Sequence, residues 1–200
     1  MNDREQELTE IGKRYGPPVR RQCVLQVSPA GADWWVRASH KRYGEVVLFI
    51  LRPNGNLLLH TKDFYPAGAM RVPSGTVKEN EPLLEAALRE AHEETGLELA
   101  IERFLAAVEF EFRFQQSSIP FSSYLFLMCE TGGVLGPLDA SERISSFSEV
   151  PVSGLLEVAE RLENMPPERQ DWGRFRAFPH RLAAELLDPR GSDSSRSKPS

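Results

Sequence analysis

Residues 75–97 read GTVKENEPLLEAALREAHEETGL, and the period of this stretch is that of a helix. From Pro82 onward, apolar residues recur at spacings of three and four, which indicates one buried stripe. The stripe consists of Leu84, Ala87, Leu88 and Ala91. Pro82 suits the first turn of a helix, and Gly96 suits its end. The sequence therefore predicts a helix from Glu81 to Gly96.

Three carboxylates share one face of this predicted helix. Glu90, Glu93 and Glu94 are three and four residues apart, a spacing that costs about 0.2–0.5 kcal/mol per pair of like charges. A divalent cation reverses that sign, because Mg²⁺ prefers hard oxygen ligands and binds substrate phosphates as well. A solvated acidic face is the alternative that spacing alone leaves open. The apolar stripe beside the carboxylates favours a metal–phosphate site.

The segment resembles the Nudix box, written G-x5-E-x7-R-E-U-x-E-E-x-G-U with U an aliphatic residue. The seven fixed positions are Gly75, Glu81, Arg89, Glu90, Glu93, Glu94 and Gly96, and Ala91 and Leu97 stand at the U positions. At roughly 7% per position, seven matches arise by chance on the order of once in 10⁸ starting points. The resemblance implies an α+β fold: a Nudix-like α/β/α sandwich with a mixed parallel and antiparallel sheet.

The resemblance also implies the residues of a metal site. The implied ligands are Glu90, Glu93 and Glu94, with the main-chain carbonyl of Ser74. The ion would be Mg²⁺, with Mn²⁺ as the alternative. Arg89 would orient a glutamate, with Glu81 or Glu93 as its partner, and the alternative is an ordinary surface ion pair worth about 0.3–0.5 kcal/mol.

A general base could be a box glutamate or a carboxylate outside the box. Glu142 is the main candidate outside it, because the segment SERISSF resembles the family segment in which such a glutamate lies. Glu109 and Glu111 are weaker candidates. A solvated carboxylate at a strand edge is the alternative for each of them.

Substrate contacts are expected in the loop FYPAGAMRVPSG, residues 64–75, which its prolines and glycines make irregular. Phe64 and Tyr65 could stack on a base and Arg71 could meet a phosphate, although loop aromatics also simply pack. A basic and aromatic run follows near the C-terminus, for which a solvated helix face is preferred to a substrate role. Its basic members are Arg169, Arg174, Arg176, His180 and Arg181.

The function implied by the resemblance is metal-dependent hydrolysis. The substrate would be a nucleoside diphosphate linked to another group, such as a nucleotide sugar or an ADP-ribose-like molecule, and a nucleoside monophosphate would be released. Nucleoside triphosphate pyrophosphatase activity and a non-catalytic ligand-sensing module are the alternatives. Isoprenoid isomerisation needs an acid–base cysteine, whereas Cys23 and Cys129 lie in apolar runs. No subfamily is identified.

Composition bounds the partners of the chain. The 200 residues are 40% hydrophobic and carry a net charge of −5, which argues against a dedicated nucleic-acid binder. The resemblance implies a small-molecule, nucleotide-type partner. No apolar stretch approaches the roughly 18 residues of a membrane span, and the N-terminus has no signal-peptide pattern, so a cytoplasmic protein is expected. A homodimer is compatible with the sequence.

One domain is expected, at residues 21–188, with extra N-terminal strands. Residues 1–20 form a polar, partly flexible segment, and residues 189–200 a disordered tail. An Asn-Gly pair at 54–55 predicts a hairpin. Strands are predicted at 23–27, 34–38, 45–52, 56–62, 100–114, 121–130 and 142–150, and further helices at 153–163 and 168–188.

Overall fold

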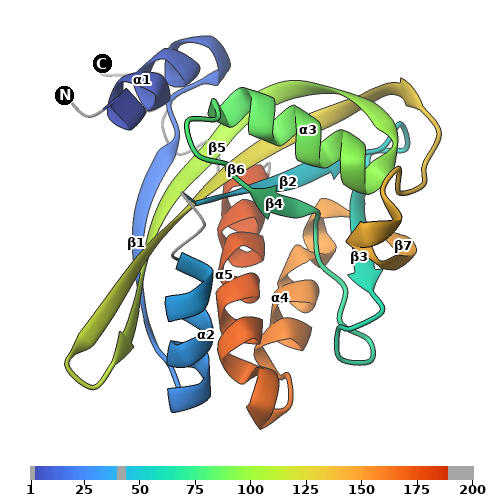
Figure 1. The fold of residues 1–200 in the computed structure, drawn as a ribbon. Coiled ribbons are helices and arrows are strands. Elements are labelled where there is room, and N and C mark those ends of the chain that lie inside the picture. The colour runs from blue at the N-terminus through green and yellow to red at the C-terminus, as the bar shows by residue number, and fades with distance from the viewer. Residues whose placement is uncertain (1–2, 40–43, 189–200) are drawn as a thin grey trace, which may run out of the picture.

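A computed structural model describes residues 3–39 and 44–188, and a sheet lies between two layers of helices (Figure 1). The α-helices are α1 (Asp3–Tyr15), α2 (Pro29–Ser39), α3 (Leu83–Thr95), α4 (Leu155–Glu163) and α5 (Gln170–Leu187). Three short 3-10 helices are η1 (Ala140–Glu142), η2 (Val152–Gly154) and η3 (Pro167–Arg169).

The sheet mixes parallel and antiparallel pairs. Its strands are β1 (Val19–Gln26), β2 (Glu45–Leu51), β3 (Leu57–Lys62), β4 (Ser74–Thr76), β5 (Leu97–Phe114), β6 (Ser117–Gly133) and β7 (Ile144–Val150). Across the described residues the order is β1-β5-β6-β2-β3-β7, with β4 paired to β2. The pairs β1–β5 and β2–β6 are parallel, and the others are antiparallel.

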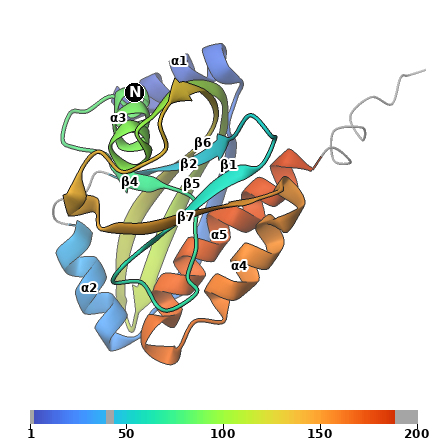
Figure 2. The ribbon, with the colours of Figure 1, turned by 90° about the vertical axis from the view of Figure 1, so that its right-hand side faces the viewer.

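Alternate side chains of β2 enter two different cores. Val46 and Leu48 pack with residues of α1 and α3 on one face of the sheet. Val47 and Phe49 pack with residues of α2, α4 and α5 on the other face, and the two layers are plain in the turned view (Figure 2). A strand buried on both faces is continuously apolar, as β2 is. The predicted α/β/α sandwich with a mixed sheet is confirmed.

The predicted box helix forms, but its buried face is rotated from the predicted stripe. Leu88 is 42% exposed, whereas Glu90 and Glu94 are buried with Ala87 and Ala91. The prediction assigned the core face by hydrophobicity alone, whereas Glu94 is turned inward to partners on β3 and β4 and Glu90 pairs with Arg89 of the same helix. Gly96 ends the helix in the left-handed conformation, at φ 67°, as a glycine after a helix commonly does.

Helix α1 occupies most of the segment for which only a polar, partly flexible chain was predicted. It buries Leu8 and Ile11 against the sheet. The Glu7 carboxylate accepts a hydrogen bond from the Leu83 N–H at 2.6 Å. Pro82 provides no side-chain cap, so Glu7 satisfies a backbone donor that the first turn of α3 leaves open. The N-terminal segment thereby helps to fix the box helix.

The strand predicted at 34–38 is wrong, because these residues belong to α2. The Ser28 hydroxyl accepts a hydrogen bond from the Gly31 N–H at 3.1 Å, which supports the first turn of this helix. Trp35 packs inward, with its ring stacked on Phe112 at a centroid distance of 3.6 Å. The aromatic residues of segment 34–38 suit a strand as well as a helix, so tertiary packing decided between the two.

The other predicted strands and helices form, including the hairpin at Asn54-Gly55 between β2 and β3. Glu142 itself lies in η1, ahead of β7 rather than within it. None of the helices in the described residues is long and apolar enough to cross a membrane. Cytoplasmic location, a homodimer and the domain limits stay predictions, and the expected tail at 189–200 lies outside the described residues.

Candidate metal and diphosphate site

Three carboxylates converge at one end of the box helix. Oxygens of Glu90, Glu93 and Glu142 all lie within 4.8 Å of one another. Glu90 and Glu93 come from α3, while Glu142 comes from η1, which the pairing of β7 with β3 brings alongside. Such a set of hard oxygen donors fits a divalent cation of the Mg²⁺ or Mn²⁺ type. We call these three residues the acidic wall.

The box glycine permits the close approach of Glu90. A Cβ built on Gly75 would lie 1.8 Å from the Cδ of Glu90, so any side chain there would collide with the carboxylate. Burial raises the pKa of Glu90, although the nearby Arg89 guanidinium opposes that shift. Glycine at the start of the box is therefore explained by steric contact with a site carboxylate.

Arg89 binds several glutamates of the box at once. Its guanidinium donates to both oxygens of Glu81, at 2.7 and 2.9 Å, and to Glu93 at 3.0 Å. Further bonds run to Glu90 at 2.8 Å and to the carbonyl of Thr76 at 3.0 Å. The hydrogen bond from Arg89 lowers the pKa of Glu81. This geometry suits an orienting residue, because both predicted partners are engaged and the guanidinium has few donors left for substrate.

Glu94 has its partners on β3 and β4 rather than on Arg89 of the box helix. Its side chain is almost fully buried; one oxygen accepts a bond from the Ser74 N–H at 3.1 Å and the other is 2.9 Å from the Lys62 Nζ. Burial raises the pKa of Glu94, and the neighbouring Arg71 and Lys62 oppose it. Among the described residues, the close carboxylate set does not include Glu94. Its predicted role as a ligand, with that of the Ser74 carbonyl, stays a prediction.

Basic side chains and carboxylates together line a cavity of about 300 Å³, which we call the polar cavity. Lys62, Arg71 and Arg176 line it together with Glu90 and Glu142. We call these three cations the basic wall. Arg176 pairs with the buried Glu45 at 2.7 Å, and its Nε has no hydrogen-bond partner in the described part of the chain. The wall thus offers buried positive charge to an anion.

Arg71, predicted as a substrate contact, lies in the polar cavity but has most of its donors engaged. It donates to the Tyr65 hydroxyl through Nε at 2.8 Å, and to the Val72 carbonyl and Ser74 hydroxyl at 2.8 and 2.9 Å. Burial lowers the pKa of this guanidinium, but the surrounding oxygens outweigh burial and raise it. Arg71 therefore adds a fixed positive charge to the wall.

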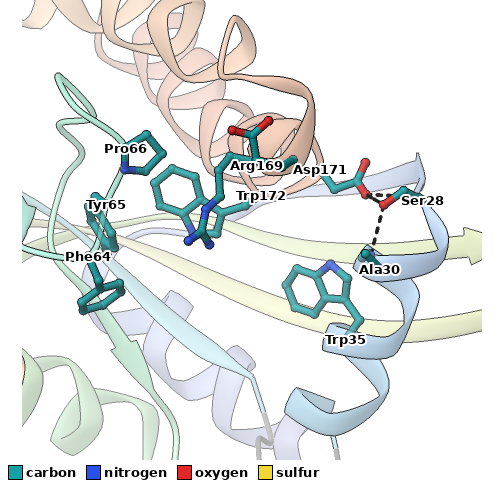
Figure 3. A pocket seen from close by; sticks show the side chains of 11 residues that line it. Ser28, Ala30, Trp35, Phe64, Tyr65, Pro66, Arg169, Asp171 and Trp172 are labelled. Atoms are coloured by element: carbon teal, nitrogen blue, oxygen red, sulfur yellow. Dashed lines mark hydrogen bonds between the residues drawn. The ribbon is translucent and has the colours of Figure 1, made fainter.

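A second cavity of about 400 Å³ adjoins the first, and we call it the aromatic cavity. Figure 3 shows Trp35 of α2 on one side, with Trp172 and Arg169 on the other and Tyr65 beyond them. The Ser28 N–H and hydroxyl donate to the Asp171 carboxylate at 2.8 and 2.7 Å, which ties α2 to α5. Phe64, Tyr65 and Trp172 line both cavities. An elongated ligand could therefore occupy both.

The preferred interpretation of the C-terminal run as a solvated face is wrong for part of it. Arg176 and His180 are buried, and Trp172 lines both cavities, because α5 packs this face against the sheet. Burial lowers the pKa of His180 to about 4. By contrast, the weaker base candidates lie on the β5–β6 hairpin: Glu109 accepts from Ser122, and Glu111 from Arg113 and Ser118.

Sequence reasoning missed Glu45 and Lys62, and it preferred a solvated face to a substrate role for the run that contains Trp172 and Arg176. A usable signal existed for Glu45, which begins the otherwise apolar run EVVLFIL, where a charge requires a partner. Lys62 gave a weaker signal as the last residue of a largely buried strand. For Trp172 and Arg176 the signal was the basic and aromatic run itself, but local spacing could not decide its role, since their places depend on where α5 docks.

A sequence model of the NUDIX domain matches residues 41–173, two thirds of the chain. The chain belongs to the Nudix family. Its box and its mixed sandwich are those of a Nudix hydrolase, a class whose members generally use divalent metals. No curated protein matches the chain in sequence.

Solved structures with a similar fold are distant in sequence. One is a UDP-X diphosphatase (17% identity, TM-score 0.49, 80% of this chain and 71% of that chain covered). Another is an ADP-ribose pyrophosphatase from Streptococcus suis (16%, 0.45, 77% and 94%). A third is the E. coli dihydroneopterin triphosphate pyrophosphohydrolase (18%, 0.45, 68% and 96%). These similarities carry no argument about the substrate of this Nudix hydrolase.

Proposed function

We propose that this Nudix hydrolase uses Mg²⁺ or Mn²⁺ to hydrolyse a diphosphate linkage in a nucleotide-type substrate. The observation that carries the proposal is the polar cavity, whose lining combines carboxylates fit for a cation with basic side chains. A diphosphate is a polyanion that needs positive charge on several oxygens. A cation at Glu90, Glu93 and Glu142 would supply part of that charge, and the basic wall would supply the rest.

The residues of the chain have separate roles in this proposal. Glu90, Glu93 and Glu142 would hold the divalent cation, which would supply positive charge for the diphosphate and make an attacking water more acidic. Arg89 holds Glu90 and Glu93 in position through its hydrogen bonds. Arg176 and Lys62 orient phosphoryl oxygens, which is most of what a protein contributes to phosphoryl transfer.

Glu142 has two candidate roles, metal ligand and general base, and experiment can separate them. A carboxylate that lies beside Glu90 and Glu93 suits either role. If Glu142 is a ligand, Glu142→Gln weakens Mn²⁺ binding. If it accepts the proton of the attacking water, the same variant binds Mn²⁺ normally and loses turnover. Full turnover in Glu142→Gln would remove it from the mechanism.

The aromatic cavity supports the finer part of the proposal, a nucleoside carried by the diphosphate. Cavities of this size lined by aromatic side chains suit a planar apolar group, and Tyr65 and Trp172 continue from this cavity into the polar one. The linkage would then lie at the acidic wall with the base beside Trp172. Hydrolysis would release a nucleoside monophosphate.

The test is a substrate panel assayed with Mg²⁺ and with Mn²⁺. It contains nucleoside diphosphate sugars, ADP-ribose, dinucleotides, coenzyme A and nucleoside triphosphates, with released nucleoside monophosphate as the readout. Pyrophosphate released from triphosphates alone would favour the alternative pyrophosphatase activity. Binding without hydrolysis across the panel would favour the ligand-sensing alternative, although all seven fixed residues of the box are intact.

A further inference from the structure

Helix α1 holds the start of the box helix from outside the box. Glu7 Oε1 accepts a hydrogen bond from the Leu83 N–H at 2.6 Å. The Arg4 guanidinium makes a longer contact with the Glu81 carbonyl, at 3.5 Å, and pairs with Glu7 one turn further along α1. Figure 1 shows α1 beside the start of α3. The two backbone groups that flank Pro82 are therefore both held by side chains of α1.

These contacts compensate for a helix start that has no cap of its own. Pro82 stands at the N-cap and makes no side-chain hydrogen bond. The open N–H groups of a first turn carry partial positive charge, so a carboxylate beside them is favourable. The side chains of Glu7 and Arg4 are only 25% and 23% exposed, which shields their contacts from water. Leu8 and Ile11 pack α1 against the sheet and thereby fix both polar residues in place.

Glu81 connects this helix start to the acidic wall. Its two carboxylate oxygens accept hydrogen bonds from Arg89 at 2.7 and 2.9 Å. The same guanidinium donates to Glu90 at 2.8 Å and to Glu93 at 3.0 Å. Because Glu81 precedes α3, the regular geometry of the helix does not set its position relative to Arg89. A shift of the segment that α1 holds would therefore move Arg89 and, with it, two carboxylates of the wall.

We propose that Glu7 is a positioning residue for the metal site, which acts through the Glu81–Leu83 segment on Arg89. The proposal rests on the proposed function, since it presupposes a divalent cation at the acidic wall. Among the described residues, Glu7 is not part of that wall and does not line the polar cavity, so its effect is indirect. The inference gives α1, which precedes the residues 41–173 matched by the NUDIX domain model, a part in the reaction.

The first experiment measures Mn²⁺ affinity, from the EPR signal of the free ion, and steady-state kinetics at saturating Mn²⁺. In the full chain, Glu7→Ala should weaken Mn²⁺ binding and lower kcat by about 10-fold each, because a displacement of about 1 Å can cost roughly 100-fold and this one is smaller. KM should stay nearly constant. Glu7→Gln, which keeps an acceptor oxygen, should recover most of both losses. Glu10→Ala removes an exposed carboxylate of the same helix that pairs with Lys13, and it should match wild type.

A double-mutant cycle tests the route from Glu7 to the wall. Glu81→Gln alone should weaken Mn²⁺ binding, since it disrupts the two hydrogen bonds with Arg89. If Glu7 acts through Glu81, Glu7→Ala should have little further effect in the Glu81→Gln background, because effects within one hydrogen-bond network are not additive. Equal fold-changes in the two backgrounds would overturn the proposal.

Thermal unfolding in EDTA separates positioning from a purely structural role and needs no activity. If Glu7→Ala melts below wild type but binds Mn²⁺ and turns over like wild type, Glu7 is only structural, and the inference fails while the proposed function stands. If wild type binds no Mn²⁺, the metal site itself is wrong and both fall. Should Glu7→Ala not fold, Glu7→Asp, whose carboxylate is one methylene shorter, takes its place in the same comparisons.

Discussion

The acidic wall and the basic wall of the polar cavity are built in opposite ways. Glu90 and Glu93 are neighbours on α3, and only Glu142 comes from elsewhere. Lys62, Arg71 and Arg176 come from β3, from the loop before β4 and from α5. The acidic wall is thus largely local, and the basic wall is entirely non-local.

The two walls also differ in how their charge is stabilised. In the acidic wall, Glu90 and Glu93 accept hydrogen bonds from Arg89, and the three carboxylates suit an added divalent cation. In the basic wall, Arg176 donates to Glu45 and Arg71 donates to the Tyr65 hydroxyl, while the Arg176 Nε has no hydrogen-bond partner among the described residues. The comparison predicts that changes in the acidic wall alter chemistry while the fold survives, whereas changes around the basic wall alter stability as well.

The largest effect is expected from Glu90→Gln. Loss of a metal-binding carboxylate should lower kcat by about 1,000-fold, or roughly 4 kcal/mol of transition-state stabilisation. Glutamine has nearly the same shape, so the melting temperature in EDTA should stay within a few degrees of wild type. Steady-state kinetics with melting curves test this, and a variant with full activity would contradict the role of the acidic wall.

A pH effect on stability is expected from His180, which lies behind the basic wall. Its folded-state pKa is about 4, lowered by burial and by Arg71 and Arg176. Between the ordinary value of 6.5 and about 4, the unfolded chain binds a proton that the folded chain does not. The contribution of His180 is therefore complete above pH 6.5 and is lost as the pH falls toward 4, by about 3 kcal/mol.

Urea unfolding in EDTA at pH 7 and pH 4.5 measures this contribution, with His180→Gln as the comparison. The variant should lose less stability than wild type over that interval. Glu90 and Glu94 have raised pKa values and act in the opposite direction, but they are common to both proteins. Equal pH dependence in the two proteins would show that His180 is not the source.

Gly75→Ala should produce an intermediate effect by moving a single carboxylate. The new Cβ would occupy the place of the Glu90 side chain, 1.8 Å from its Cδ. A displacement of about 1 Å can cost roughly 100-fold in rate, so kcat should fall by about that factor. Mn²⁺ affinity should fall with it, whereas Gly136→Ala, where an added Cβ would meet no atom within 4 Å, serves as the control for activity.

The smallest effect is expected in the aromatic cavity. Trp172→Ala should raise KM by about 5- to 100-fold, the range for loss of one base–aromatic stack, with kcat nearly unchanged. Trp172→Phe should recover most of the affinity. A fall in kcat with constant KM would instead assign Trp172 to the chemistry at the acidic wall.

The sequence predicted the box helix, its Gly96 terminus and the pairing of Arg89 with glutamates, because all of these depend on residues within one helix and its flanking turns. It did not predict which side of that helix is buried. Leu88 is exposed and Glu94 is buried, since the latter has partners on β3 and β4. Hydrophobicity alone assigns a charged side chain to solvent, and an ion pair supplied by distant strands reverses that assignment.

By itself, the sequence determined the family and the mixed sandwich through its match to the Nudix box, and it placed Glu90 and Glu93 together because they lie within one turn of a regular helix. Only the tertiary structure decided that α5 turns Trp172 and Arg176 toward that helix, and that Lys62 lies between Glu94 and Glu142. These contacts join residues that are 32 or more positions apart in the chain, and such contacts depend on how the layers dock rather than on local spacing.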